Sequence, residues 1–152
     1  NNLFFLCFIF EKKSLIRFTH DDFLIFPETD LAHWLKTIAA EEGHTVDELE
    51  YNFVEADTLL NLNKEYLNHD TYTDIITFDY TQNKSIKAEV YISYEALKNN
   101  AKIHGQKLES ELLRLLSHAL LHCIGYNDKT IDEKDIMRDK EEDCINLFHV
   151  KH

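Results

Sequence analysis

The most informative segment of the chain is Ser117-His118-Ala119-Leu120-Leu121-His122-Cys123-Ile124-Gly125-Tyr126-Asn127-Asp128. Residues four apart on a helix point in the same direction one turn apart, so His118 and His122 can bind one metal ion together. Gly125 can end that helix in a left-handed conformation, which lets Asp128 return toward the two imidazoles as a third ligand. Two His and one Asp suit a zinc site whose fourth position stays open for water, an arrangement typical of catalytic zinc.

The rest of this predicted helix supports the same interpretation. Its apolar residues repeat at helical spacing and should face the core: Leu112, Leu113, Leu116, Leu120 and Ile124. One His on an amphipathic helix is usually an ordinary polar residue, so the metal prediction depends on the combination of two His, a Gly and an Asp. We expect the remaining His residues of the chain to be ordinary surface or core residues.

The ligand spacing is that of the metzincin peptidases, but those enzymes carry a Glu directly after the first His as the general base. This chain has Ala119 there, which disfavours peptide hydrolysis and leaves a metallopeptidase as the least favoured alternative. In a hydrolase of this kind the proton would be transferred by water on the metal or by a carboxylate from elsewhere in the fold. Arg114, one turn before His118, could hold a phosphate beside the metal or could be a solvated Arg on the helix face.

Hydrophobic periodicity predicts the elements that precede this helix. We expect a strand at 15–18, a helix capped by Thr29 or Asp30 that stops at Gly43, and a strand at 48–56. A second helix, capped by Asp57, should bury Leu59, Leu60, Leu62 and Tyr66. Two runs rich in β-forming residues, 74–80 and 88–94, should pair as antiparallel strands.

Helical patterns dominate the second half of the chain. They cover about 93–103, 108–124 and 132–148, and Thr130 with Glu133 has the spacing of a capping box at the start of the last helix. Strands and helices in this order, with an antiparallel pair, predict an α+β fold in which a small sheet is covered by helices, one of them a zincin-like metal helix.

Length, charge and cysteine content limit the function. A chain of 152 residues fits one domain, which we place at 15–152. The chain has 16 Lys and Arg against 28 Asp and Glu, a net charge of −12, so any nucleic acid must be contacted locally rather than through a broad basic surface. The three Cys have no paired spacing, which favours reduced thiols in a cytoplasmic protein.

Residues 3–10 form an apolar octet, LFFLCFIF, that is too short to span a bilayer. The basic region and small-residue cleavage site of a signal peptide are not visible around it, so we expect no membrane association. We interpret residues 1–14 as an extension of uncertain status, either an additional strand or an artefact at the start of the gene.

Several motifs together resemble the YbeY family of bacterial rRNA maturation factors. The family box His-Gly-x-Leu-His-Leu-x-Gly-Tyr-Asp-His is similar to residues 118–128, with Asp128 in place of the third His. Residues 63–70 and 73–78 resemble the family's N-x-x-Y-R-G-K-D and T-D-V-L-S-F, with Leu67 at the position of an Arg to which the family assigns catalysis or RNA contact. Residues 88–93 resemble the family's G-D-I-x-I-S strand, with Glu89 where an Asp is usual.

This resemblance implies a small mixed sheet with flanking helices and a three-ligand zinc site in a cleft, with one Zn²⁺ per chain. It implies a zinc-dependent, single-strand-specific endoribonuclease that acts on rRNA precursors in rRNA maturation and ribosome quality control, with the ribosome or small-subunit proteins as further partners. Asp74, at the entrance to a predicted strand, is a candidate for proton transfer or a simple turn cap. The alternative is a non-catalytic, zinc-containing ribosome assembly factor, which Leu67 and the missing Glu favour slightly.

Overall fold

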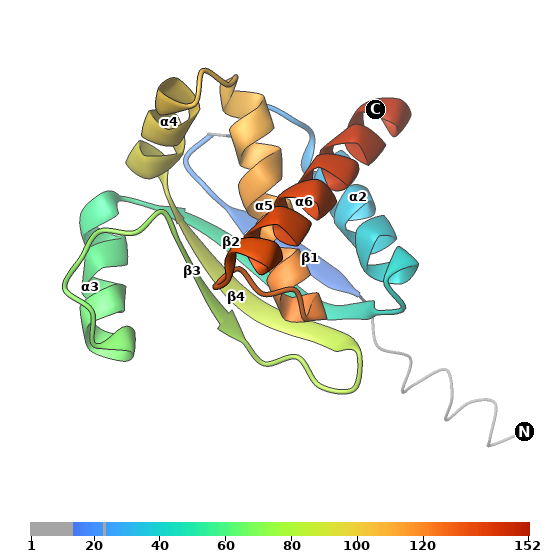
Figure 1. Cartoon of the computed structure of the whole chain (residues 1–152), viewed down its shortest axis with the longest axis horizontal. Helices are drawn as coiled ribbons and strands as arrows, with labels where there is room; N and C mark the ends of the chain where they lie inside the picture. Colours follow the sequence, from blue (N-terminus) through green and yellow to red (C-terminus); the bar gives the residue numbers. More distant parts are fainter. Residues whose placement is uncertain (1–13, 23) are drawn as a thin grey trace, which may run out of the picture.

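The computed structural model describes residues 14–22 and 24–152 and contains a mixed four-stranded sheet (Figure 1). The strands are β1 (Leu15–Thr19), β2 (Thr45–Val54), β3 (Ile75–Asp79) and β4 (Ser85–Ser93), in the spatial order β1-β2-β4-β3. The β1–β2 and β2–β4 pairs are parallel, and β3 pairs with β4 in the antiparallel direction. The predicted antiparallel pair and the predicted α+β class are therefore confirmed, whereas the expectations for residues 1–13 lie outside the described residues.

Five helices accompany the sheet in the described part of the chain: α2 (Glu28–Glu41), α3 (Ala56–Leu67), α4 (Tyr94–Ile103), α5 (Leu108–Ile124) and α6 (Ile131–Lys151). In Figure 1, α2 and α5 lie against one face of the sheet and α6 packs over them on the same side, whereas α3 lies on the other side, beside β3 and β4. None of these helices is both long enough and apolar enough to cross a membrane.

Helix α5 lies at the centre of the core because it is apolar on nearly every side. It contacts α2, α4, α6 and the sheet, and its leucines at 112, 113, 115, 116, 120 and 121 are buried. From the sheet, the buried Tyr51 hydroxyl donates a hydrogen bond of 2.8 Å to the Leu116 carbonyl oxygen. A single stripe of α5 remains for polar side chains, and it carries Glu111, Arg114, His118 and His122.

An aromatic side chain of α2 joins this helix to α6. The Trp34 indole donates a 2.8 Å hydrogen bond from Nε1 to the carbonyl oxygen of Cys144, and its ring meets Phe148 edge-on with centroids 5.4 Å apart. Both ends of this amphipathic side chain are therefore satisfied in the core, which holds α6 in place beside α5.

Two predicted helix caps are wrong by two or three residues. Helix α2 begins at Glu28 with Pro27 at the cap position, rather than at a Thr29 or Asp30 cap. Helix α3 begins at Ala56, where the backbone N–H donates to the Glu95 carboxylate of α4 at 3.0 Å. A carboxylate from a neighbouring helix thus satisfies the end of α3, which makes a cap by Asp57 unnecessary.

The burial predicted for α3 is correct only in part. Leu59 is buried and Leu60 and Leu62 are half-buried, but Tyr66 is 61% exposed. The Tyr66 ring lies at the edge of the sheet, where it meets Phe78 with centroids 5.6 Å apart. A short helix that covers two strands at a sheet edge has no second layer to bury its last turn.

The start of α6 provides a test of local stability, because the capping box predicted there is present. The Thr130 hydroxyl accepts from the Glu133 backbone N–H at 3.1 Å, and the Glu133 carboxylate accepts from the Thr130 N–H at 2.9 Å. We predict that Thr130→Ala lowers the free energy of unfolding by about 1 kcal/mol in urea titrations. The exposed Thr58→Ala, inside α3, is the control, and an equal loss in both variants would contradict a specific role of the cap.

Candidate metal centre

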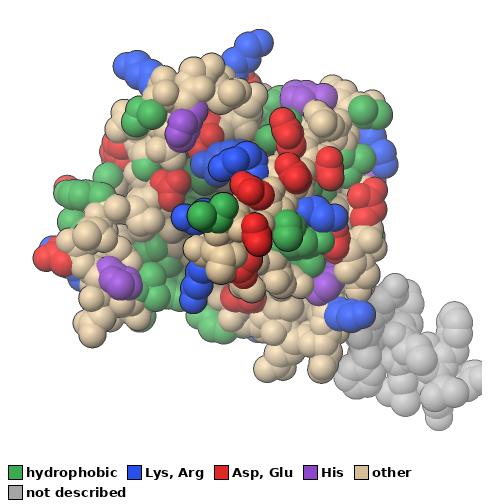
Figure 2. Space-filling view, viewed as in Figure 1, with side chains coloured by type: hydrophobic (Ala, Val, Ile, Leu, Met, Phe, Trp, Pro, Cys, Tyr) green, Lys and Arg blue, Asp and Glu red, His purple; other side chains and the backbone are tan. Residues whose placement is uncertain are grey.

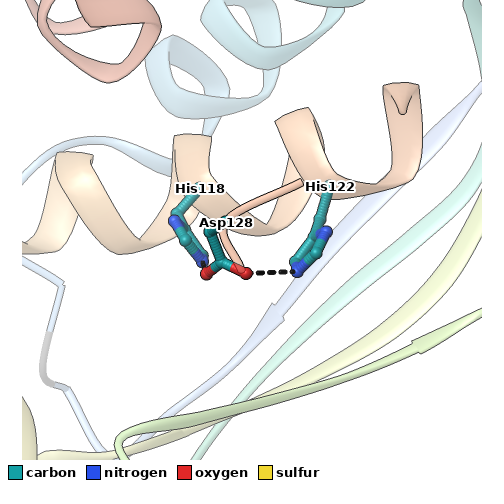
Figure 3. A group of neighbouring side chains, drawn as sticks. All are labelled: His118, His122 and Asp128. Carbon is teal, nitrogen blue, oxygen red and sulfur yellow. Dashed lines mark ion pairs between the residues drawn. The ribbon is translucent and has the colours of Figure 1, made fainter. Parts of the chain in front are cut away.

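The polar stripe of α5 ends in two imidazoles that share a carboxylate. His118 and His122 lie one helical turn apart with ring centroids separated by 5.6 Å. The helix stops at Gly125, which has φ +126°, and the Gly125 and Tyr126 N–H groups both donate to the Leu121 carbonyl oxygen. The chain then reverses and brings Asp128 between the two rings, as Figure 3 shows.

The three side chains fit a single metal ion. Asp128 Oδ2 lies 3.4 Å from His118 Nε2, and Oδ1 lies 3.7 Å from His122 Nε2. Ligand atoms about 2.0–2.2 Å from a tetrahedral ion lie about 3.3–3.6 Å from one another, so these separations leave room for an ion between them. One donor atom from each residue lies within 4.8 Å of the other two. His118, His122 and Asp128 can therefore hold one metal ion together, as the sequence motif predicted.

The metal ligands open onto a cleft of about 570 Å³ between α5, β3 and the segment that follows α3. The cleft is lined by Asn63, Leu67, His69, Thr71, Tyr72, Thr73, Asp74, Ile75, Ile76, Thr77, His118, His122 and Asp128. Three of the segments that carry the resemblance described above, residues 63–70, 73–78 and 118–128, thus meet at one site. His69, which we expected to be an ordinary histidine, is an exposed residue on the wall of this cleft.

Asp74 lies in the cleft at the start of β3. Its Oδ2 accepts a 2.9 Å hydrogen bond from the Asn100 side chain of α4, and its carbonyl oxygen accepts from the Ser93 N–H at 3.0 Å. The backbone contact joins β3 to the end of β4, and the side-chain contact orients the carboxylate. Asp74 therefore lines the cleft, and proton transfer by its carboxylate stays a prediction.

Arg114 is held by carboxylates. Its guanidinium makes two hydrogen bonds to Glu111 on the same helix, with Nε–Oε2 at 2.9 Å, and Nη1 lies 3.8 Å from Glu141 on α6. These partners raise the pKa of Arg114, mainly through the Glu111 hydrogen bond. The side chain borders a second hollow, of about 480 Å³, and is not among the residues that line the metal cleft. Phosphate binding by Arg114 stays a prediction.

The motif did not point to Glu141, which contacts the candidate ligand His118 directly. Glu141 Oε2 lies 2.6 Å from His118 Nδ1, and the side chain is only 7% exposed. A signal was present in the sequence, because Met137, Glu141, Cys144 and Phe148 form one helical stripe that is buried in α6. A Glu within an otherwise apolar stripe needs partners that compensate its buried carboxylate, and His118 and Arg114 are these partners.

The fold and the site together define a class, an α+β protein with a helix-borne triad able to hold one metal ion. A family model described as Endoribonuclease YbeY matches residues 18–149, so the chain belongs to the YbeY family. A relative from Christiangramia forsetii named Endoribonuclease YbeY is 38% identical over 141 residues, which cover 93% of this chain and 99% of the relative. One of the same name from Cytophaga hutchinsonii is 40% identical over 139 residues, covering 90% of this chain and 97% of that protein.

A solved structure has a similar fold. The solution structure of a Thermotoga maritima protein aligns with a TM-score of 0.64 over 90% of this chain and 91% of that one, at 21% identity. At this identity the likeness concerns the fold, and it agrees with the mixed sheet and helices described above.

The site geometry predicts which residues control metal content. We expect the His118→Ala, His122→Ala double variant to lose the ion, because a single carboxylate cannot replace two imidazoles, whereas the exposed His149→Ala should keep it. Asp128→His should retain metal with unchanged or tighter binding. Elemental analysis after reconstitution with Zn²⁺ measures this, and stoichiometric metal in the double variant would show that the site lies elsewhere.

Proposed function

We propose that this protein is a zinc-dependent endoribonuclease that cleaves single-stranded rRNA precursors in the cytoplasm, during rRNA maturation and ribosome quality control. The observation that carries the proposal is the opening of the His118, His122 and Asp128 triad onto a cleft, in a chain whose relatives are named endoribonucleases. The described cysteines, Cys123 and Cys144, are buried free thiols, which suits a reducing compartment.

The donor set supports zinc. Two imidazole nitrogens and one carboxylate oxygen are common ligands of catalytic zinc, and three protein ligands leave a coordination position for water or substrate. When bound, such an ion lowers the pKa of water and compensates the charge of a phosphate. His118, His122 and Asp128 hold the ion, and Gly125 provides the turn that allows Asp128 to do so.

Within the cleft, Asp74 is the carboxylate best placed to exchange a proton. Among the described lining residues the acidic side chains are Asp74 and Asp128, and Asp128 is committed to the metal site. Ala119, where metzincins have a Glu, is fully buried beside His118. Asn100 fixes Oδ2 of Asp74, which leaves the second oxygen as a base toward the substrate.

RNA would be held in this cleft by contacts other than positive charge. The described lining residues include no Lys or Arg, and Leu67 takes the place of the family Arg. On the face shown in Figure 2, acidic and basic side chains are interspersed and form no basic patch. Tyr72 is 66% exposed at the cleft, and its hydroxyl donates to Asp57 at 3.0 Å, which fixes the ring. An unpaired base can stack on such a ring, which supports a preference for single strands.

A second candidate function is a zinc-containing ribosome assembly factor without catalysis. The absence of a cation from the described cleft walls favours it, because phosphodiester cleavage usually needs positive charge near the developing negative charge. In the endoribonuclease the ion itself supplies this charge, and Arg114 is the further candidate for a cation that holds phosphate.

Cleavage assays separate the two functions. We expect purified zinc-loaded protein to cut a single-stranded RNA and to leave the matching duplex intact, and both chelator treatment and His122→Ala should reduce cleavage to background. The His122→Ala protein, purified in parallel, also reveals any contaminating nuclease, and His149→Ala should cleave as the wild type does. Binding of RNA without any cleavage would support the assembly factor, and cleavage that survives in the His122→Ala protein at the wild-type rate would contradict the metal mechanism.

The cation-poor cleft predicts that RNA affinity depends weakly on salt. We expect the slope of log affinity against log salt to be shallower than about −4, the value for about six phosphate contacts on a single strand. Tyr72→Ala should weaken binding by about 1–3 kcal/mol at every salt concentration, because it removes stacking rather than charge. Tyr80→Ala, exposed and outside the cleft, is the control, and a steep slope with no effect of Tyr72→Ala would contradict this mode of binding.

A further inference from the structure

We infer that Glu141, held in place by Arg114, is a positioning residue of the metal centre. It accepts the Nδ1 proton of His118 and so directs the Nε2 lone pair of that ring toward the ion. This inference rests on the proposed metal centre and concerns residues on α5 and α6 that neither the ligand motif nor the cleft includes.

The two ring nitrogens of His118 face different carboxylates. Nδ1 lies 2.6 Å from Glu141 Oε2, and Nε2 lies 3.4 Å from Asp128 Oδ2. A neutral imidazole carries one proton, so an acceptor at Nδ1 selects the tautomer whose Nε2 lone pair is free for a metal. The shorter contact is therefore the one that orients the ring, and the longer one spans the place of the ion.

Burial makes the Glu141 contact specific. Its side chain is 7% exposed, and a carboxylate removed from water needs compensation by charge and hydrogen bonds. His118 provides one partner, and Arg114 Nη1, 3.8 Å from Oε1, provides the other. Arg114 is itself fixed by two hydrogen bonds to Glu111, which is only 2% exposed. A continuous chain of contacts thus links α5 and α6, and it runs from Glu111 through Arg114 and Glu141 to His118.

The other imidazole of the site is less constrained. The His122 side chain is 39% exposed against 16% for His118, and its ion-pair partner within the described residues is Asp128. One ligand is therefore fixed by the core and the other lies at the cleft surface. Loss of Glu141 should therefore allow the His118 ring to rotate and should weaken metal binding by all three ligands.

Zinc affinity of the apoprotein tests this role without RNA. In competition with a chromophoric chelator, we expect Glu141→Leu to weaken Zn²⁺ binding by about 10- to 100-fold. Glu141→Gln keeps an acceptor oxygen for Nδ1 and should rescue most of this loss. The neighbouring Glu142→Gln, which is exposed, is the matched control and should bind as the wild type does. Equal affinity of Glu141→Leu, Glu141→Gln and the wild type would overturn the inference.

A spectroscopic measurement separates positioning from simple packing. The visible absorption of Co²⁺ in the site reports ligand geometry, so we expect an altered spectrum in Glu141→Leu and a nearly normal one in Glu141→Gln. If Glu141→Leu does not fold, the Gln variant and Arg114→Gln remain as tests. A loss of thermal stability with unchanged zinc affinity and Co²⁺ spectrum would assign Glu141 to packing alone and overturn the inference.

Arg114→Gln distinguishes this role from phosphate binding. If Arg114 acts through Glu141, the variant lowers zinc affinity in the absence of RNA. If Arg114 holds phosphate instead, zinc affinity stays at the wild-type value while KM for RNA rises, and Arg114 has no part in positioning. Because zinc binding is measured alone, a protein that shows the affinity losses but cuts no RNA would keep this inference and reject the endoribonuclease function.

Discussion

The burial of helix α5 is the constraint on which the structure and its chemistry depend. Sheet and helices enclose its leucines, and a single stripe is left for polar groups. That stripe begins with the ion pair between buried Glu111 and half-buried Arg114 and ends with His118 and His122 beside the cleft. The backbone positions of His118 and His122 have little freedom to change, because they belong to a helix that cannot leave the core.

Charge is distributed unusually for a protein whose relatives are named endoribonucleases. The chain carries a net charge of −12, and Arg114, one turn before His118, is bound to carboxylates. The ion would therefore be the strongest positive charge in the cleft, and a phosphate would be attracted to it locally rather than by the surface as a whole. Tyr72 and the polar groups of the cleft wall add contacts that carry no charge.

The sequence predicts those parts of the structure that depend on local spacing. The His118, His122, Gly125 and Asp128 geometry follows from helical pitch and one left-handed turn, and the Thr130 capping box follows from a four-residue pattern. Contacts between distant residues are not visible in such patterns. Glu95 accepts a hydrogen bond from the first backbone N–H of α3, although the two residues are 39 positions apart in the sequence. Glu141 and His118 are in contact although they are 23 positions apart. Leu60, Leu62 and Tyr66 have the pattern of a buried helix, but α3 covers too little of the sheet to bury them.

The central claim is that two imidazoles and one carboxylate hold a single zinc ion with a position open to the cleft. X-ray absorption of the zinc-loaded protein tests this most directly, because it reports ligand type and distance at the ion itself. The account predicts two imidazole nitrogens at about 2.0–2.1 Å together with oxygen ligands at about 2.0–2.2 Å. A sulfur ligand at about 2.3 Å, or a shell with no imidazole, would contradict it.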